Sequence, residues 1–129
     1  MSRAKALFVP SMYLEPFGMV AIESLMSGTP LITTDWGGLR EINLDGVTGY
    51  RCNMLQDFVT AAKRIDEISP VTCRKFGELY SIEHVKHAYE KWFKDLYELW
   101  GEGWNKLDRS FEAGPAVFHE ELGVSGLPL

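Results

Sequence analysis

Two short apolar runs with an apolar helical segment between them set the strongest limit on how this chain can fold. Residues 6–10 (ALFVP) form an unbroken apolar run that ends at a proline, and residues 30–34 (PLITT) form a second run. Such short runs are typical of strands that are covered on both faces. Residues 17–27 are predicted to form a helix that ends at Gly28, because glycine commonly stops helices. A strand, a helix and a strand joined by short connections predict a parallel sheet with a right-handed crossover, and therefore an α/β fold.

The following segment adds a third strand to this expectation. Residues 35–38 (DWGG) are predicted to form a loop, since glycine allows backbone conformations that other residues avoid. A short helical turn is expected over residues 39–43, and a tight turn over residues 45–49 (DGVTG). Residues 50–52 then read as a short strand. The sequence thus predicts a sheet of about three parallel strands with flanking helices.

Three helices are expected after the sheet. The apolar residues of segment 58–68 fall on one helix face, and Ser69 followed by Pro70 opens a second helix. Ser81 caps a long third helix, and its aromatic stripe at helical spacing predicts a buried core contact rather than a ligand site. That stripe consists of Val85, Tyr89, Trp92, Phe93, Leu96 and Trp100.

The domain organisation is simple. We expect residues 1–100 to form one partial α/β domain, and residues 101–129 to form a C-terminal extension rich in glycine and proline. That extension is predicted to be either an extended arm lying over a surface or partly disordered. A chain of 129 residues is long enough to bury a core.

Composition excludes several classes of function. The net charge of −5 and the pI near 5.2 argue against a surface for nucleic acid or anionic membrane, which would need clustered lysine and arginine. No apolar stretch approaches the length of a membrane span, and no signal peptide precedes the first strand. Cys52 and Cys73 could pair, but two reduced thiols in a cytoplasmic protein are the favoured interpretation. Neither a C-x-x-C pair nor a Cys/His cluster indicates a zinc site.

A carboxylate inside the first predicted helix is the most informative single residue. On a helical wheel at about 100° per residue, Glu23 falls about 40° from Met19 and therefore between Met19 and Val20, inside an apolar arc. A buried carboxylate without a partner is unfavourable, so we expect Glu23 to be buried and to accept hydrogen bonds, unless this end of the helix faces a cleft. Two neighbouring hydroxyls, as on a ribose, suit such an acceptor. An internal salt bridge or a loop cap is the alternative.

A second carboxylate lies just before this helix. Glu15 precedes the first turn, where the backbone N–H groups of Gly18, Met19 and Val20 have no helical partner. Such a helix start attracts anions, and a glycine lets a phosphate approach the backbone closely. Ligands of α/β folds bind at the carboxyl ends of the strands, where this helix begins. Alternatively, Glu15 is only a carboxylate placed favourably near the helix dipole. The residues alone predict a cleft for an anionic ligand that carries hydroxyls.

Residues 10–42 (PSMYLEPFGMVAIESLMSGTPLITTDWGGLREI) resemble a known family. The segment is similar to the donor-binding domain of GT-B glycosyltransferases, the retaining group 1 (family 4-like) enzymes whose signature is Glu, seven residues, Glu. The likeness continues through residues 45–50 (DGVTGY) and weakens into the helices, where residues 80–83 (YSIE) look like a helix start of the family. It covers residues 4–97 and implies the second half of a Rossmann-like donor domain.

The resemblance assigns roles to individual residues. It implies that Glu15 is the catalytic-site residue that contacts hydroxyls of the transferred sugar, and that Glu23 holds the ribose hydroxyls of a nucleotide. The resemblance also implies that Phe17, Gly18, Met19 and Val20, between the two glutamates, bind the donor. The backbone N–H groups of Gly18, Met19 and Val20 would bind sugar and diphosphate oxygens. It further implies retention of anomeric configuration, a nucleotide-diphospho-sugar as substrate, and no metal or cofactor. No Asp-x-Asp motif of metal-using sugar transferases occurs in the chain.

The chain also departs from the family pattern. A full enzyme of this type has an acceptor domain, and a basic pair that neutralises the diphosphate; neither is present here. We therefore expect a fragment, a truncated gene product or one piece of a split enzyme, which is inactive alone and needs the missing N-terminal domain or a companion chain. Two alternatives are a non-catalytic nucleotide-sugar or protein-binding module, and a piece of a glycogen or starch synthase. Because half a sheet leaves an edge strand bare, we expect self-association or coverage by the C-terminal extension.

Overall fold

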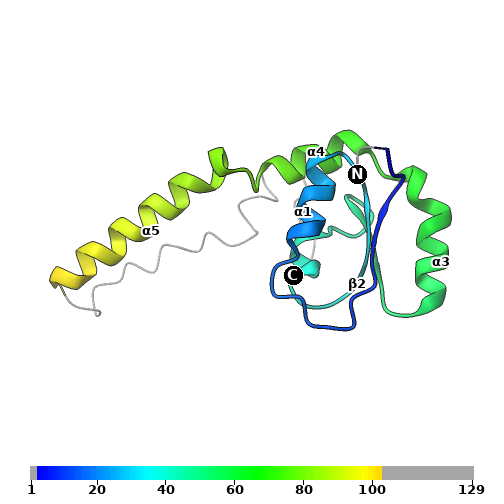
Figure 1. Ribbon diagram of the computed structural model, residues 1–129, viewed down its shortest axis with the longest axis horizontal. Coiled ribbons are helices and arrows are strands. Elements are labelled where there is room, and N and C mark those ends of the chain that lie inside the picture. Colours follow the sequence, from blue (N-terminus) through cyan, green and yellow to red (C-terminus); the bar gives the residue numbers. More distant parts are fainter. Residues whose placement is uncertain (1–2, 103–129) are drawn as a thin grey trace. The chain divides into compact units, whose positions relative to one another are not determined.

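The computed structural model describes residues 3–102, and these divide into two units between residues 78 and 79. The first unit contains the sheet and the second contains one long helix (Figure 1). The expected extension lies outside the described residues from residue 103 onward. The elements in chain order are β1 (Leu7–Val9), α1 (Met19–Met26), β2 (Leu31–Thr34), α2 (Leu39–Ile42), β3 (Gly49–Cys52), α3 (Leu55–Arg64), the 3-10 turn η1 (Ile65–Glu67), α4 (Pro70–Glu78) and α5 (Ile82–Glu102).

The three strands form one parallel sheet in the order β1-β2-β3, which confirms the predicted α/β fold with a partial Rossmann-like sheet. Leu7 pairs with Leu31, and Leu31 pairs with Gly49 on the other side. All four residues of β2 are buried, as expected for a central strand that is covered on both faces. β1 lies at the edge, where Phe8 stays half exposed and stacks on Phe58 of α3 with ring centroids 6.4 Å apart.

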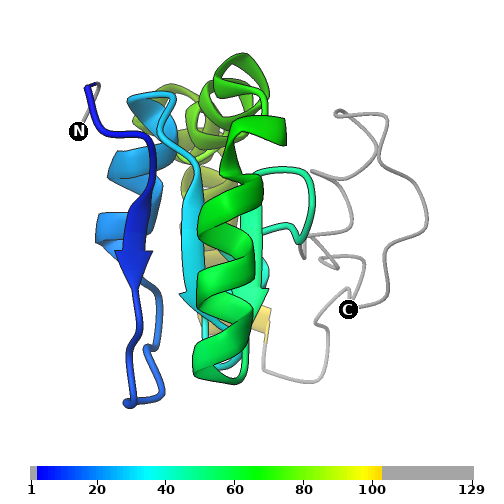
Figure 2. The same cartoon turned by 90° about the vertical axis from the view of Figure 1, so that its right-hand side faces the viewer.

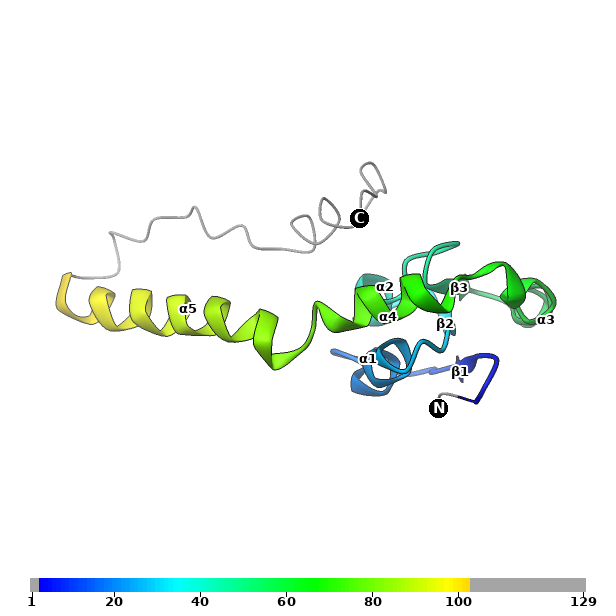
Figure 3. The same ribbon diagram turned by 90° about the horizontal axis from the view of Figure 1, so that it is seen from above.

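Helices cover both faces of this sheet. Figures 2 and 3 show α3 over one face and α1, α2 and α4 over the other. The core on the second face contains fully buried side chains from the sheet and the helices, including Leu25, Leu31, Leu39, Ile42 and Phe76. The apolar runs recognised in the sequence are therefore the residues that bury the sheet.

Close packing between α1 and α4 depends on a helical glycine. A Cβ atom added to Gly77 would lie 2.5 Å from the backbone nitrogen of Met26 and 2.8 Å from the carbonyl carbon of Leu25. Both distances are far shorter than van der Waals contact, so the two helix backbones approach each other directly. Gly77 is buried in α4 and allows this approach.

The prediction of a buried aromatic stripe on the last helix is wrong for the described side chains. On α5, Tyr89, Trp92 and Phe93 are 58%, 44% and 62% exposed, while Val85 and Leu96 are only partly buried. The side chain of Trp100 lies outside the described part. Helical spacing shows that one face is apolar, but it does not show what covers that face. Within residues 3–102, no helix is both long enough and apolar enough to cross a membrane.

Replacing Gly77 should reveal the contact between α1 and α4. In an open helix, Gly→Ala stabilises by about 1 kcal/mol. We expect Gly77→Ala to destabilise instead, by about 1–3 kcal/mol, because the added methyl group overpacks the contact. Urea unfolding measures the change, and Lys75→Ala at an exposed position of the same helix is the control. A stabilised Gly77→Ala variant would contradict the close approach.

The two cysteines should react only after unfolding. Both Cys52 and Cys73 are free and buried, and burial raises the pKa of each thiol from 9.0 to about 11. Because the folded-state pKa exceeds the unfolded value, this contribution to the free energy of unfolding is complete below pH 9 and is lost as the pH rises towards 11. We expect slow labelling by a thiol-specific disulfide reagent at pH 8 and rapid labelling of two thiols in urea. Fast labelling of the native chain would disprove this burial.

Candidate functional site

Two loops meet at the carboxyl edge of the sheet, where the sequence placed the site. The loop after β1 carries Glu15, and the loop after β2 carries Trp36. The hydroxyl of Thr34 and the indole N–H of Trp36 both donate to the carbonyl oxygen of Ser11, at 3.0 and 2.9 Å. These bonds fasten the first loop to the second, so the position of Glu15 depends on both strands.

Backbone contacts hold the two loops together more tightly still. The N–H of Gly38 donates to the carbonyl oxygen of Glu15 at 2.6 Å. A Cβ atom at Gly37 would lie 2.6 Å from the same oxygen, and one at Gly38 would lie 2.7 Å from the carbonyl oxygen of Pro16. Gly37 also has a positive φ of 59°, which favours glycine. Both glycines are therefore needed for this backbone to support the Glu15 loop.

The start of α1 has the conformation that the glycine in the motif suggests. Gly18 is buried and has φ 83° and ψ 51°, in the left-handed region, directly before the first helical residue. No side chain caps this helix start. A Cβ atom at Gly18 would lie 2.9 Å from Cδ2 of Leu39 and 3.6 Å from Cγ of Glu15. The first N–H groups of α1 thus begin next to the Glu15 side chain, and they have no intrahelical acceptor.

The expectation that Glu23 is buried is wrong. Glu23 is exposed, and so are the apolar side chains around it on the wheel: Met19 is 59%, Val20 40% and Met26 39% exposed. The opposite face of α1 carries the packing, through the buried residues Ala21, Ile22, Ser24 and Leu25. The whole arc that contains Glu23 therefore faces away from the core. Phe17 is half exposed on the preceding loop and Glu15 is partly buried.

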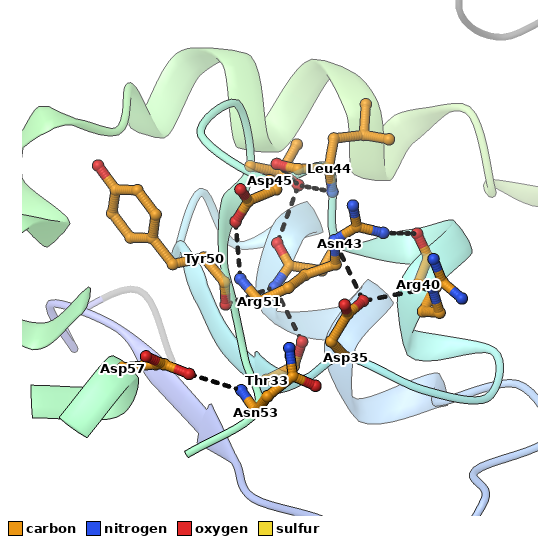
Figure 4. Close-up of polar contacts among 11 residues, drawn as sticks. Thr33, Asp35, Arg40, Asn43, Leu44, Asp45, Tyr50, Arg51, Asn53 and Asp57 are labelled. Carbon is orange, nitrogen blue, oxygen red and sulfur yellow. Dashed lines mark hydrogen bonds and ion pairs between the residues drawn. The ribbon is translucent and has the colours of Figure 1, made fainter. Parts of the chain in front are cut away.

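An ion cluster that the sequence analysis did not identify lies at the same edge. Oδ1 of Asp35 pairs with Nε of Arg40 at 3.2 Å and with Nε of Arg51 at 3.5 Å (Figure 4). Nη1 of Arg51 also donates to the carbonyl oxygen of Arg40 at 3.4 Å. The cluster ties the loop after β2 to α2 and β3. The sequence signal that could have revealed this cluster is Arg51, a charged residue inside the short strand β3, because a cation there requires a nearby partner.

A buried amide completes this support. Asn43 is fully buried, and its Nδ2 donates to the hydroxyl of Thr33 and to the carbonyl oxygen of Tyr50, each at 3.0 Å (Figure 4). The hydroxyl of Thr48 donates to Oδ1 of Asn43 at 3.4 Å. The end of α2 is thereby fixed to β2 and β3.

A hollow of about 490 Å³ lies elsewhere, beside residues that precede β1 and β2. Its two cations already have partners: Lys5 pairs with Asp66 and Arg74 pairs with Glu78. It contains neither Glu15 nor Glu23, so it does not belong to the candidate site.

Comparison with known proteins identifies the family. The profile described as "Glycosyl transferases group 1" matches residues 1–70. A glycogen synthase of Mycobacterium tuberculosis is 52% identical over 50 residues, which cover 39% of this chain and 12% of that protein. A D-inositol 3-phosphate glycosyltransferase of Rhodococcus erythropolis is 36% identical over 92 residues, covering 64% of this chain and 21% of that protein.

A sucrose synthase of Acidithiobacillus caldus is 33% identical over 92 residues, or 61% of this chain and 12% of that protein. The chain therefore spans only between 12% and 21% of the length of these three relatives. With its parallel sheet and a profile match over more than half of its residues, the chain belongs to the group 1 glycosyl transferases.

Proposed function

We propose that this chain supplies part of the donor site of a retaining glycosyltransferase and binds a nucleotide-diphospho-sugar. The observation that carries the proposal is the left-handed Gly18 at the start of α1, with Glu15 beside it and Glu23 exposed on the same helix. An uncapped helix start favours phosphate oxygens, and a carboxylate accepts hydrogen bonds from neighbouring hydroxyls. A diphosphate between a sugar and a ribose has both features.

In this proposal the exposure of Glu23 is a functional property. A carboxylate that is open to solvent in the free chain can accept the ribose hydroxyls when the donor binds. Met19 and Val20 offer apolar surface on either side of it, and the N–H groups of Gly18, Met19 and Val20 meet diphosphate and sugar oxygens. Glu15 contacts the transferred sugar and is the residue proposed for catalysis. The reaction uses neither a metal nor a cofactor.

We also propose that the chain alone does not turn over its donor. A leaving diphosphate needs cations or hydrogen-bond donors that are aimed at its developing charge. Arg40 and Arg51 lie near the site, but both pair with Asp35. The remaining charge stabilisation and the acceptor site would come from an N-terminal domain or a companion chain, in keeping with the much greater length of the relatives. The two reduced thiols favour a cytoplasmic setting.

A second candidate is a glucan synthase of the glycogen or starch synthase type. The specific support is the 52% identity over 50 residues with a protein named glycogen synthase. Glucan extension from ADP-glucose or UDP-glucose, assayed with the companion polypeptide added, separates this candidate from transfer to other acceptors. A chain that binds nucleotide sugars but never transfers them, even with the companion added, would instead be a non-catalytic binding module.

Isothermal titration with UDP-, GDP- and ADP-glucose tests donor binding. We expect one of the three to bind, and Glu23→Gln to weaken it about tenfold to a hundredfold, since hydrogen bonds to a charged group contribute about 1.5–3 kcal/mol. Asp66→Asn removes an exposed carboxylate that pairs with Lys5 and is the control. Equal affinities of Glu23→Gln and the native chain would refute the ribose contact. Donor hydrolysis by the isolated chain would refute only the proposed inactivity.

Gly38→Ala tests whether the glycine contact positions the site. Gly38 has an ordinary helical φ of −61°, so alanine introduces no backbone strain, only a methyl group 2.7 Å from the carbonyl oxygen of Pro16. We expect donor affinity to fall at least tenfold, about 1.4 kcal/mol, because the Glu15 loop must move. Gly46→Ala is the control, because nothing lies within 4 Å of its Cβ position. Unchanged affinity of Gly38→Ala would show that the donor does not depend on this loop.

A further inference from the structure

The ion cluster at the carboxyl edge of the sheet contains more positive than negative charge. Oδ1 of Asp35 lies 3.2 Å from Nε of Arg40 and 3.5 Å from Nε of Arg51, and Figure 4 shows the carboxylate joined to both residues. Two cations and one anion leave a net charge of +1. No other lysine or arginine occurs between residues 10 and 54, the segment that contains the loops after β1, β2 and β3. Within this segment, an anionic ligand has only these two cations as partners.

The two arginines differ in how firmly they are held. The side chain of Arg51 is 24% exposed, its Nε is buried, and its Nη1 donates to the carbonyl oxygen of Arg40. The side chain of Arg40 is 52% exposed, and its ion pair with Asp35 includes no hydrogen bond to the buried Oδ1. Charge attraction of this kind contributes little at an exposed position. Arg40 is therefore the weakly held member of the cluster.

Loss of Arg40 from the cluster would not leave Asp35 without a counter-ion. Arg51 lies 3.5 Å from the same carboxylate oxygen and stays there. Removing the partner of a buried charge is unfavourable because the charge is left uncompensated, and here Arg51 compensates it. Release of Arg51 would instead separate a buried guanidinium nitrogen from its carboxylate. Arg40 is thus the cation that the cluster can release.

The chain places Arg40 close to the start of α1. A Cβ atom at Gly18 would lie 2.9 Å from Cδ2 of Leu39 and 3.6 Å from Cδ1 of Ile42, so the short helix α2 packs directly against this start. Arg40 follows Leu39 and belongs to the first turn of α2. The first N–H groups of α1 favour anions, and a guanidinium binds phosphate through two parallel hydrogen bonds. A phosphate at the start of α1 can therefore use both kinds of donor.

We propose that Arg40 exchanges partners when the donor binds: its guanidinium leaves Asp35 for diphosphate oxygens, while Arg51 keeps Asp35 compensated. The inference rests on the proposed function and assigns one more binding residue to the same site. A diphosphate carries more negative charge than one carboxylate, and it offers the hydrogen bonds that Arg40 does not make with Oδ1 of Asp35. Arg40 then supplies part of the charge stabilisation that a leaving diphosphate needs.

Isothermal titration with UDP, GDP and ADP tests the exchange. We expect Arg40→Gln to weaken binding of the preferred nucleotide about tenfold to a hundredfold. Arg40→Lys keeps the charge and should restore part of this affinity. Arg74→Gln removes an exposed cation of α4 that pairs with Glu78, and this matched control should bind like the native chain. Equal affinities of Arg40→Gln and the native chain overturn the exchange alone. A native chain that binds none of the three nucleotides overturns the proposed donor site as well.

A second variant separates exchange from a purely structural role of the cluster. If Asp35 competes with the diphosphate for Arg40, Asp35→Asn strengthens nucleotide binding by up to about fivefold. Glu41→Gln removes the same charge at the next position of α2, outside the cluster, and should have a smaller effect. Weaker binding by Asp35→Asn with unchanged urea unfolding overturns the exchange. If Asp35→Asn unfolds more easily, the Arg40 variants decide: recovery in Arg40→Lys supports the exchange, and equal loss in Arg40→Lys and Arg40→Gln overturns it.

Discussion

The contact between two glycines and the Glu15 loop is the constraint on which the rest of the site depends. Gly37 and Gly38 follow the central strand β2, and their backbone lies directly against the backbone of Glu15 and Pro16. No other residue type fits there, because any Cβ atom would overlap a carbonyl oxygen. The contact fixes the position of Glu15 and Pro16, in the loop before α1, and therefore the direction in which that helix starts. The chemistry of α1 is thus determined by a loop about 20 residues further along the chain.

Other interactions keep this glycine loop in place. Asp35 joins α2 and β3 through two arginines, and the buried Asn43 joins α2 to β2 and β3. Asp35 contacts the two arginines as ion pairs, with no hydrogen bond to its buried Oδ1 or to Nε of Arg51, whereas both polar atoms of the Asn43 side chain are hydrogen-bonded. Buried polar groups that are fully paired rigidify a site, whereas a group that loses its partner destabilises it. The carboxyl edge is therefore a preformed surface and not a flexible rim.

The sequence was sufficient to predict the local elements and their order, but not which surfaces are covered. The apolar runs predicted β1, β2 and the helix between them, because burial on two faces leaves an unbroken apolar pattern. The wheel placed Glu23 correctly beside Met19, but the prediction of burial failed because a wheel does not show which arc meets the core. The same limit applies to Trp92 on α5. The Asp35 cluster escaped prediction since it joins residues from three different elements.

The exposed arc of α1 and the unpaired edge of β1 are both surfaces of the described residues that a further polypeptide could cover. α1 packs on β1, and among residues 3–102 β1 pairs with no strand other than β2, so a polypeptide that paired with this edge would lie near α1. The unpaired N–H and C=O groups of an edge strand favour such an addition. Half-exposed Phe8, on the α3 face of this edge strand, would lose water at the same step. Completion of the sheet and completion of the proposed donor site would then be a single event, in which burial of apolar surface stabilises the arrangement that the ligand requires.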